Sequence, residues 1–189
     1  MNRVFQIAFS VSLLATSWLL MMAFHELGHV AGAMLTGGTV QKVILHPLAI
    51  SQTDVFPNPS PLLVVWAGPI VGCVLPLVIA ASLPKSWVVE RKTVWFLAGF
   101  CLIANGCYIG FGSFDRVGDC GNMLDAGTPL VCLWLFGAIA IPAGLFIWHR
   151  LGSVAEFVSK PDLIPPHHAI AMVLTLLTIV LMELYCSRV

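Results

Sequence analysis

The chain has 189 residues, of which 59% are hydrophobic and only 10% are charged; nine basic and nine acidic residues give a formal net charge of zero. Soluble globular chains average roughly 25% charged residues, so this chain has too little charge to solvate the surface of a globule. The composition excludes a soluble enzyme, a nucleic-acid-binding protein with a basic face and a disordered tail. It fits a protein whose solvent is the lipid bilayer.

Five apolar segments are long enough, or nearly so, to cross the hydrocarbon core, which takes about 20 residues of helix. They cover approximately residues 4–35, 62–83, 93–114, 129–149 and 168–186, and the last reaches this length only by including Glu183. We therefore predict an all-α polytopic membrane protein with about five transmembrane helices. Because no internal repeat is visible, we expect residues 1–189 to form a single membrane-embedded domain.

The last third of the first predicted helix contains the sequence His25-Glu26-Leu27-Gly28-His29. Two histidines four positions apart share one helix face, so both imidazoles can reach one Zn²⁺, and the adjacent glutamate can take a proton from water. Ionisable side chains at the end of an apolar helix are costly and indicate a function. We predict His25 and His29 as metal ligands and Glu26 as the catalytic residue; the alternative is a set of hydrogen-bonded side chains without metal.

Between the first two spans, residues 39–50 are rich in β-branched side chains and predict one or two short strands. Residues 54–61 contain three prolines and predict a rigid link into the second span.

A catalytic zinc ion needs a third protein ligand. Since successive spans run in opposite directions, the segment 113–128 lies on the same side of the membrane as the end of the first span. It contains three of the five aspartates of the chain, Asp115, Asp119 and Asp125. The same argument admits His46 and Glu183 as ligands. It excludes the histidines on the opposite side, which are His149, His167 and His168.

Several of these motifs together resemble the site-2 protease family of intramembrane zinc metalloproteases. They are HELGH at the end of the first core helix, Gly37-Gly38 after it, a strand segment, and Ala67-Gly68-Pro69 in the next span. The resemblance implies that two histidines and an aspartate after the third core helix bind zinc and that the glutamate is the general base.

Of the two aspartates that the resemblance leaves open as the third ligand, we predict Asp119, with Asp125 as the alternative. Asp119, after Gly118, resembles the ligand position in compact, divergent members, whereas Asp125 lies in a partial match to the Leu-Asp-Gly-Gly motif of the family. Gly72 stands where the family often has an asparagine.

The expected function is that of a zinc-dependent intramembrane endopeptidase with one zinc ion per chain. Its substrate is expected to be a membrane protein with an extended or unwound segment. The first alternative is a zinc-binding membrane protein without protease activity. A divalent-metal transporter is less favoured, because a transport path needs polar positions through the membrane and the second to fourth spans offer few beyond Asn105.

Overall fold

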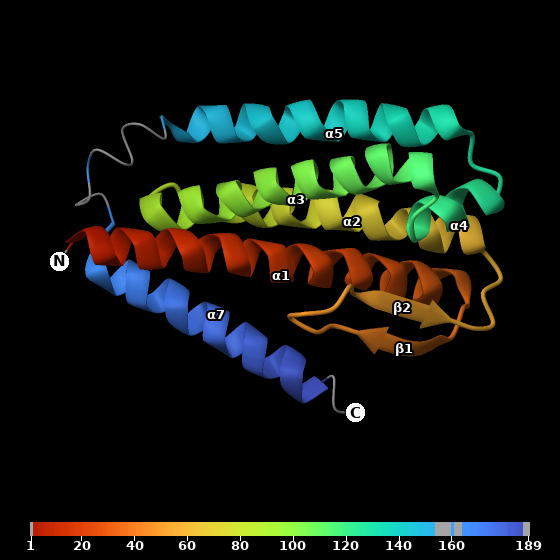
Figure 1. Cartoon of the computed structure of the whole chain (residues 1–189), viewed down its shortest axis with the longest axis horizontal. Coiled ribbons are helices and arrows are strands. Elements are labelled where there is room, and N and C mark those ends of the chain that lie inside the picture. The colour runs from red at the N-terminus through yellow and green to blue at the C-terminus, as the bar shows by residue number, and fades with distance from the viewer. Residues whose placement is uncertain (1, 154–159, 161–163, 187–189) are drawn as a thin grey trace.

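The computed structural model of the chain describes residues 2–153, 160 and 164–186 (Figure 1). Its elements are, in order, α1 Asn2–Thr36, β1 Val40–Ile44, β2 Gln52–Val55, α2 Pro61–Ser82, α3 Val88–Asp115, α4 Asp119–Asp125, α5 Leu130–Leu151 and α7 Pro166–Cys186. Within these described residues, five helices are long and apolar enough to cross a membrane; α4 is the short one. The predicted all-α polytopic fold with a small strand segment after the first helix is confirmed.

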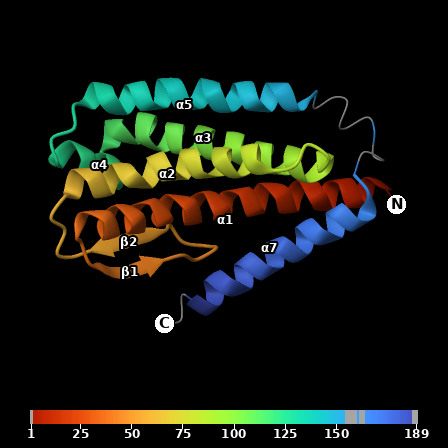
Figure 2. The ribbon, with the colours of Figure 1, turned by 180° about the vertical axis from the view of Figure 1, so that it is seen from behind.

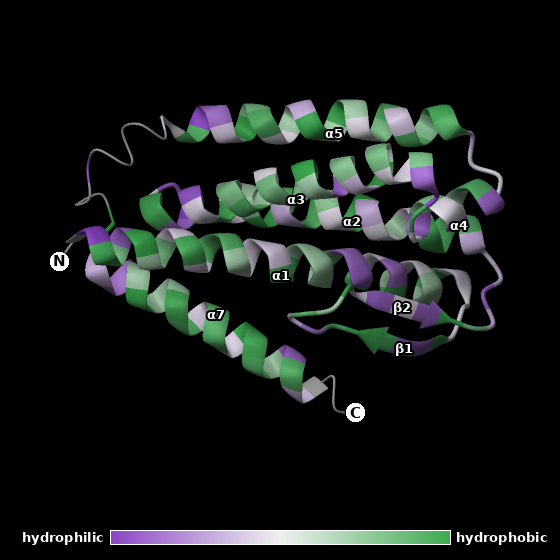
Figure 3. Cartoon of the chain, viewed as in Figure 1, coloured by the Kyte–Doolittle hydropathy of each residue, from purple (hydrophilic) through white to green (hydrophobic). Residues whose placement is uncertain are grey.

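The long helices form a bundle with α1, α2 and α3 at its centre. α5 packs along α3, and α7 packs along α1 (Figure 1). Figures 1 and 2 show α7 starting beside the N-terminal end of α1 and diverging from it toward its own C-terminal end. Because the chain reverses after each of α1, α2 and α3, the end of α1, the strands and α4 meet at one end of the bundle. Hydrophilic residues gather at that end (Figure 3).

Small residues bring the backbones of α1 and α2 into contact. A Cβ atom at Gly28 would overlap the carbonyl group of Ala67, and one at Gly32 would lie 2.8 Å from the Cβ atom of Ala67. Such small residues are typical of closely packed membrane helices. The close approach fixes how α1 is rotated and shifted against α2, and therefore where its histidines lie.

α3 begins at Val88, whereas the apolar segment was predicted to begin at residue 93. The additional turn carries Glu90, Arg91 and Lys92, and Arg91 donates a hydrogen bond to the carbonyl oxygen of Leu83 beyond the end of α2 (3.2 Å). A charged first turn is compatible with a helix end outside the hydrocarbon core. The apolar pattern therefore located the span but not the start of the helix.

The two strands form an antiparallel hairpin in which Lys42 lies opposite Asp54. α1 ends through Gly37, with φ of +78°, and the N–H of Gly38 donates to the carbonyl oxygen of Ala33 (2.8 Å), as expected for a helix that ends at glycine. The prediction of strand within residues 39–50 is confirmed for β1. The turn after β1 occupies residues 45–51, and the second strand follows at Gln52–Val55. The predicted link of residues 54–61 is therefore wrong at its start, because Asp54 and Val55 belong to β2.

Candidate metal centre

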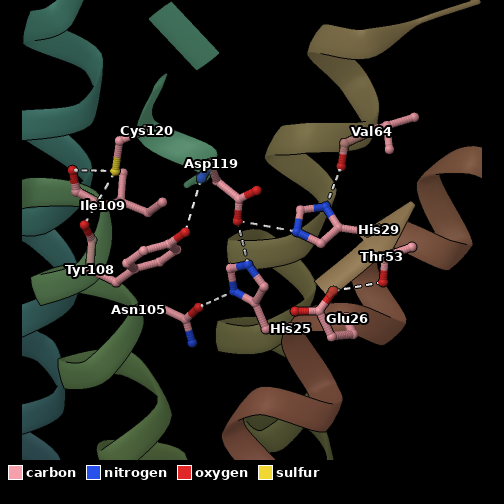
Figure 4. Close-up of polar contacts among 10 residues, drawn as sticks. All are labelled: His25, Glu26, His29, Thr53, Val64, Asn105, Tyr108, Ile109, Asp119 and Cys120. Carbon is pink, nitrogen blue, oxygen red and sulfur yellow. Dashed lines mark hydrogen bonds and ion pairs between the residues drawn. The ribbon is translucent and has the colours of Figure 1, made fainter. Parts of the chain in front are cut away.

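Two histidines of α1 and one aspartate of α4 meet at the polar end of the bundle (Figure 4). Nε2 of His25 lies 2.7 Å from Oδ2 of Asp119, and Nε2 of His29 lies 3.2 Å from the same oxygen. One ligand atom from each residue lies within 4.8 Å of the others. Both histidines are buried. The spacing in α1 therefore does place two imidazoles around one point, as the sequence predicted.

The other ring nitrogen of each histidine is held by a carbonyl oxygen. Nδ1 of His25 lies 2.7 Å from Oδ1 of Asn105, and Nδ1 of His29 lies 2.9 Å from the carbonyl oxygen of Val64. Nδ2 of Asn105 donates to the carbonyl oxygen of Cys101 (2.9 Å), so its Oδ1 is the atom that faces His25. A carbonyl oxygen only accepts hydrogen bonds, so each Nδ1 carries a proton. A ring protonated only at Nδ1 has its lone pair at Nε2, as in metal-binding histidines.

These three side chains fit a zinc ion. Two imidazole nitrogens and one carboxylate oxygen are common zinc ligands, and three protein ligands leave a fourth tetrahedral position open. Two lone pairs and an anionic oxygen that point at one buried place need a cation between them, either a proton or a metal ion. His25, His29 and Asp119 are therefore arranged as a site for such a cation.

Asp119 reaches the histidines because α4 begins against Tyr108 of α3. The backbone N–H of Asp119 donates to the hydroxyl oxygen of Tyr108 (2.9 Å). Gly118 has φ of +50°, and a side chain there would overlap the same hydroxyl group, so glycine is required.

Glu26 lies beside this cluster and contacts the hairpin. It is only 4% exposed, and its Oε2 accepts a hydrogen bond from the hydroxyl group of Thr53 on β2 (2.6 Å). Figure 4 shows one carboxylate oxygen of Glu26 meeting Thr53, while the other carries no drawn contact. The carboxylate is thus buried, fixed at one oxygen and adjacent to the cluster of His25, His29 and Asp119.

Of the aspartates in the segment 113–128, the structure brings only Asp119 to the histidines. Asp125, at the opposite end of α4, is exposed and forms an ion pair with Arg116. Asp115 is the exposed last residue of α3. The structure therefore places Asp119, and not Asp125, beside the two histidines.

The other admitted ligands lie outside the cluster. His46 lies in the turn after β1, where its Nδ1 accepts a hydrogen bond from the N–H of Leu48 (3.1 Å). Glu183 is buried on α7. Neither joins the group formed by His25, His29 and Asp119.

A sequence model of the Peptidase M50B-like family matches residues 4–109, which is more than half of the chain. The chain belongs to this family. The match confirms the resemblance to the site-2 proteases, and with the five apolar helices it identifies a multi-pass integral membrane protein of a metalloprotease family. No curated protein and no solved structure was found to match the chain.

The matched region of this M50B-like chain contains the two histidines but ends before Asp119, so the choice of that residue depends on the geometry. The structure also adds Asn105, whose role the sequence did not reveal. A Cβ atom at Gly72 would lie 3.1 Å from Nδ2 and 3.2 Å from Oδ1 of Asn105. Gly72, where the family often has asparagine, therefore leaves room for an asparagine side chain from α3. The sequence contains one indication of this role, which is that Asn105 is an amide in an otherwise apolar span.

The packing against His29 explains why glycine stands at position 68, in the Ala67-Gly68-Pro69 motif. A Cβ atom at this position would overlap the imidazole ring of His29. Glycine here lets α2 pack over that ring while the carbonyl group of Val64, one turn earlier, holds its Nδ1.

The cluster opens into a cavity of about 1810 Å³. Its walls come from α1, the start of α2, α3, α4 and the hairpin; on the hairpin side they include all of β2. Away from the cluster, Trp18, Met21 and Met22 of α1 supply an apolar wall. The lining of the cavity is more apolar than polar.

Proposed function

We propose that this M50B-like protein is a zinc-dependent endopeptidase that hydrolyses a peptide bond in or near a transmembrane segment of another membrane protein. The observation that carries the proposal is the meeting of His25, His29 and Asp119 beside the buried carboxylate of Glu26, at the wall of a large cavity. Membership of the family supports a metalloprotease in general.

The residues divide the chemistry between them. His25, His29 and Asp119 would hold zinc, which when bound acidifies water and polarises a carbonyl group. Glu26 would accept a proton from the attacking water as the water oxygen bonds to the scissile carbonyl carbon. When the carbon–nitrogen bond breaks, Glu26 would return this proton to the leaving amine. Asn105 and the carbonyl group of Val64 would keep both imidazoles oriented throughout.

A substrate has to be extended at the cleaved bond, because a helix hides its carbonyl groups. β2 lines the cavity, whereas the residues of β1 do not. One edge of β2 pairs with β1, which leaves its other edge for a further strand. We propose that an extended substrate segment adds to this edge through backbone hydrogen bonds.

The test compares the wild-type protein with the Glu26→Gln variant, each co-expressed with a panel of epitope-tagged single-span membrane proteins. We expect at least one reporter to be cleaved by the wild type and to remain intact with Glu26→Gln. Zinc content of both purified proteins, measured by mass spectrometry, is expected to be one ion per chain. Equal cleavage by the two proteins would show that Glu26 is not the base.

The same experiment separates the second candidate function. A protein that binds zinc in both forms but cleaves no reporter is a zinc-binding membrane protein without protease activity. A protein without zinc in either form contradicts the metal site itself.

A further inference from the structure

Thr53 connects the hairpin to the carboxylate proposed as the base. Its hydroxyl group donates a 2.6 Å hydrogen bond to Oε2 of Glu26. A hydrogen bond to an ionised group is about twice as strong as one between neutral groups. The two residues are 27 positions apart and belong to different elements, so this contact exists only when β2 lies against α1.

The pleat of β2 explains why Thr53 faces inward. Thr53 and Val55 are half-buried, whereas Gln52 and Asp54 are exposed, and Nε2 of Gln52 donates to Oδ1 of Asp54 on the outer face (2.6 Å). On the inner face, Val55 packs over Gly38. A Cβ atom at Gly38 would lie 3.0 Å from Cγ1 of Val55. An apolar β-branched residue would satisfy such a face. The hydroxyl group of Thr53 therefore has a specific use, which is its bond to Glu26.

The hairpin is joined to the rest of the chain at its base and lies mainly against α1. At the base, the N–H of Thr39 donates to the carbonyl oxygen of Pro57 (3.1 Å) and the N–H of Phe56 donates to that of Thr39 (2.8 Å). Its outer end is exposed and apolar, with Leu48 at 91% and Ile50 at 89% exposure. A movement of the hairpin away from α1 would therefore break the bond between Thr53 and Glu26.

We infer that Thr53 is a positioning residue for Glu26, and that the position of the hairpin thereby regulates the active site. With the hairpin against α1, Thr53 fixes one oxygen of the carboxylate and leaves the other for the proton of water. With the hairpin displaced, the carboxylate loses this orientation. This inference rests on the proposed function for its effect on proteolysis, but the contact itself can be tested separately.

The activity test uses the reporter cleaved by the wild type and compares Thr53→Val, Thr53→Ser and Thr175→Val. Valine keeps the shape of threonine without the hydroxyl group, and serine keeps the hydroxyl group. Thr175 is an exposed residue of α7 that bonds to the carbonyl oxygen of Ala171, so its substitution controls for the loss of a hydroxyl group elsewhere. We expect Thr53→Val to lower kcat about tenfold or more, with KM and zinc content close to wild type. Thr53→Ser and Thr175→Val are expected to retain most of the activity.

A second measurement does not require activity. Trypsin can cut after Lys42, an exposed residue of β1, when the hairpin opens. The rate of this cut in detergent-purified protein therefore reports how often the hairpin opens. We expect Thr53→Val to accelerate the cut roughly tenfold in the wild-type background. In a Glu26→Ala background, where the acceptor is absent, Thr53→Val is expected to change the rate little.

The outcomes are distinguishable. If no reporter is cleaved by the wild type, the proposed function fails, and the tryptic rates alone decide whether Thr53 and Glu26 are coupled. Equal loss of activity in Thr53→Val and Thr53→Ser would overturn the inference, because the hydroxyl group would not be the cause. Acceleration by Thr53→Val of the same size in both backgrounds would also overturn it.

Discussion

Replacement of Asn105 by leucine tests how the metal site is held. Asn105 is 1% exposed and accepts a hydrogen bond from Nδ1 of His25 at 2.7 Å. Leucine has a similar size and can lie against Gly72, but it offers no acceptor. The variant therefore removes the acceptor of His25 and the donor to the carbonyl oxygen of Cys101, and leaves the apolar packing largely intact.

The expected magnitude follows from the buried Nδ1–H of His25. Without an acceptor, a buried donor costs about 1–3 kcal/mol, and loss of the group that orients a metal-binding histidine weakens metal binding about 10–100-fold. We expect the zinc dissociation constant of Asn105→Leu to rise by that factor, which is roughly 1.4–2.7 kcal/mol. Asn105→Asp keeps an acceptor and is expected to bind zinc at least as tightly as the wild type.

The assay is a competition for zinc between the detergent-purified protein and a chromophoric chelator. Asn122→Ala is the matched control, because Asn122 is an exposed asparagine of α4 at the cavity wall and is expected to leave the affinity unchanged. If Asn105→Leu binds zinc as tightly as the wild type, the orienting role of Asn105 is wrong.

Four further predictions concern the same centre. Asp119→Ala is expected to lose zinc in metal analysis while Asp125→Ala keeps it; the reverse result would make Asp125 the ligand. Gly68→Ala places a methyl group against the ring of His29 and is expected to destabilise the protein by about 1–3 kcal/mol, seen as a lower Tm; an unchanged Tm would contradict the packing. Tyr108→Phe removes the acceptor of the Asp119 N–H and is expected to lower the free energy of unfolding by about 0.5–1.5 kcal/mol, measured in a thermal melt. An unchanged Tm would show that other contacts hold α4. A strong chelator is expected to lower the Tm of the wild type, since zinc at 100 times its dissociation constant contributes about 2.7 kcal/mol; Asp119→Ala should show no such shift.

The sequence by itself determined the five apolar spans and the placement of His25 and His29 on one helix face. A membrane helix must present about 20 apolar residues to lipid, and this requirement is visible in the sequence. The geometry of one helical turn likewise places His25 and His29 on one face wherever the helix packs. Both are local rules, so they needed no knowledge of neighbouring elements.

Only the tertiary structure showed that Asp119, and not Asp125, lies beside the two histidines. The two residues have the same chemistry and bound the same seven-residue helix α4. The chosen contact joins positions 94 apart and depends on which end of α4 lies against α1.

The partners of the site were decided in the same way. Asn105 and Thr53 reach His25 and Glu26 from α3 and from the hairpin. Their positions depend on how the helices pack, which the glycines between α1 and α2 help to fix. A sequence pattern specifies neighbours within a turn of helix, but contacts between elements follow from packing over the whole bundle.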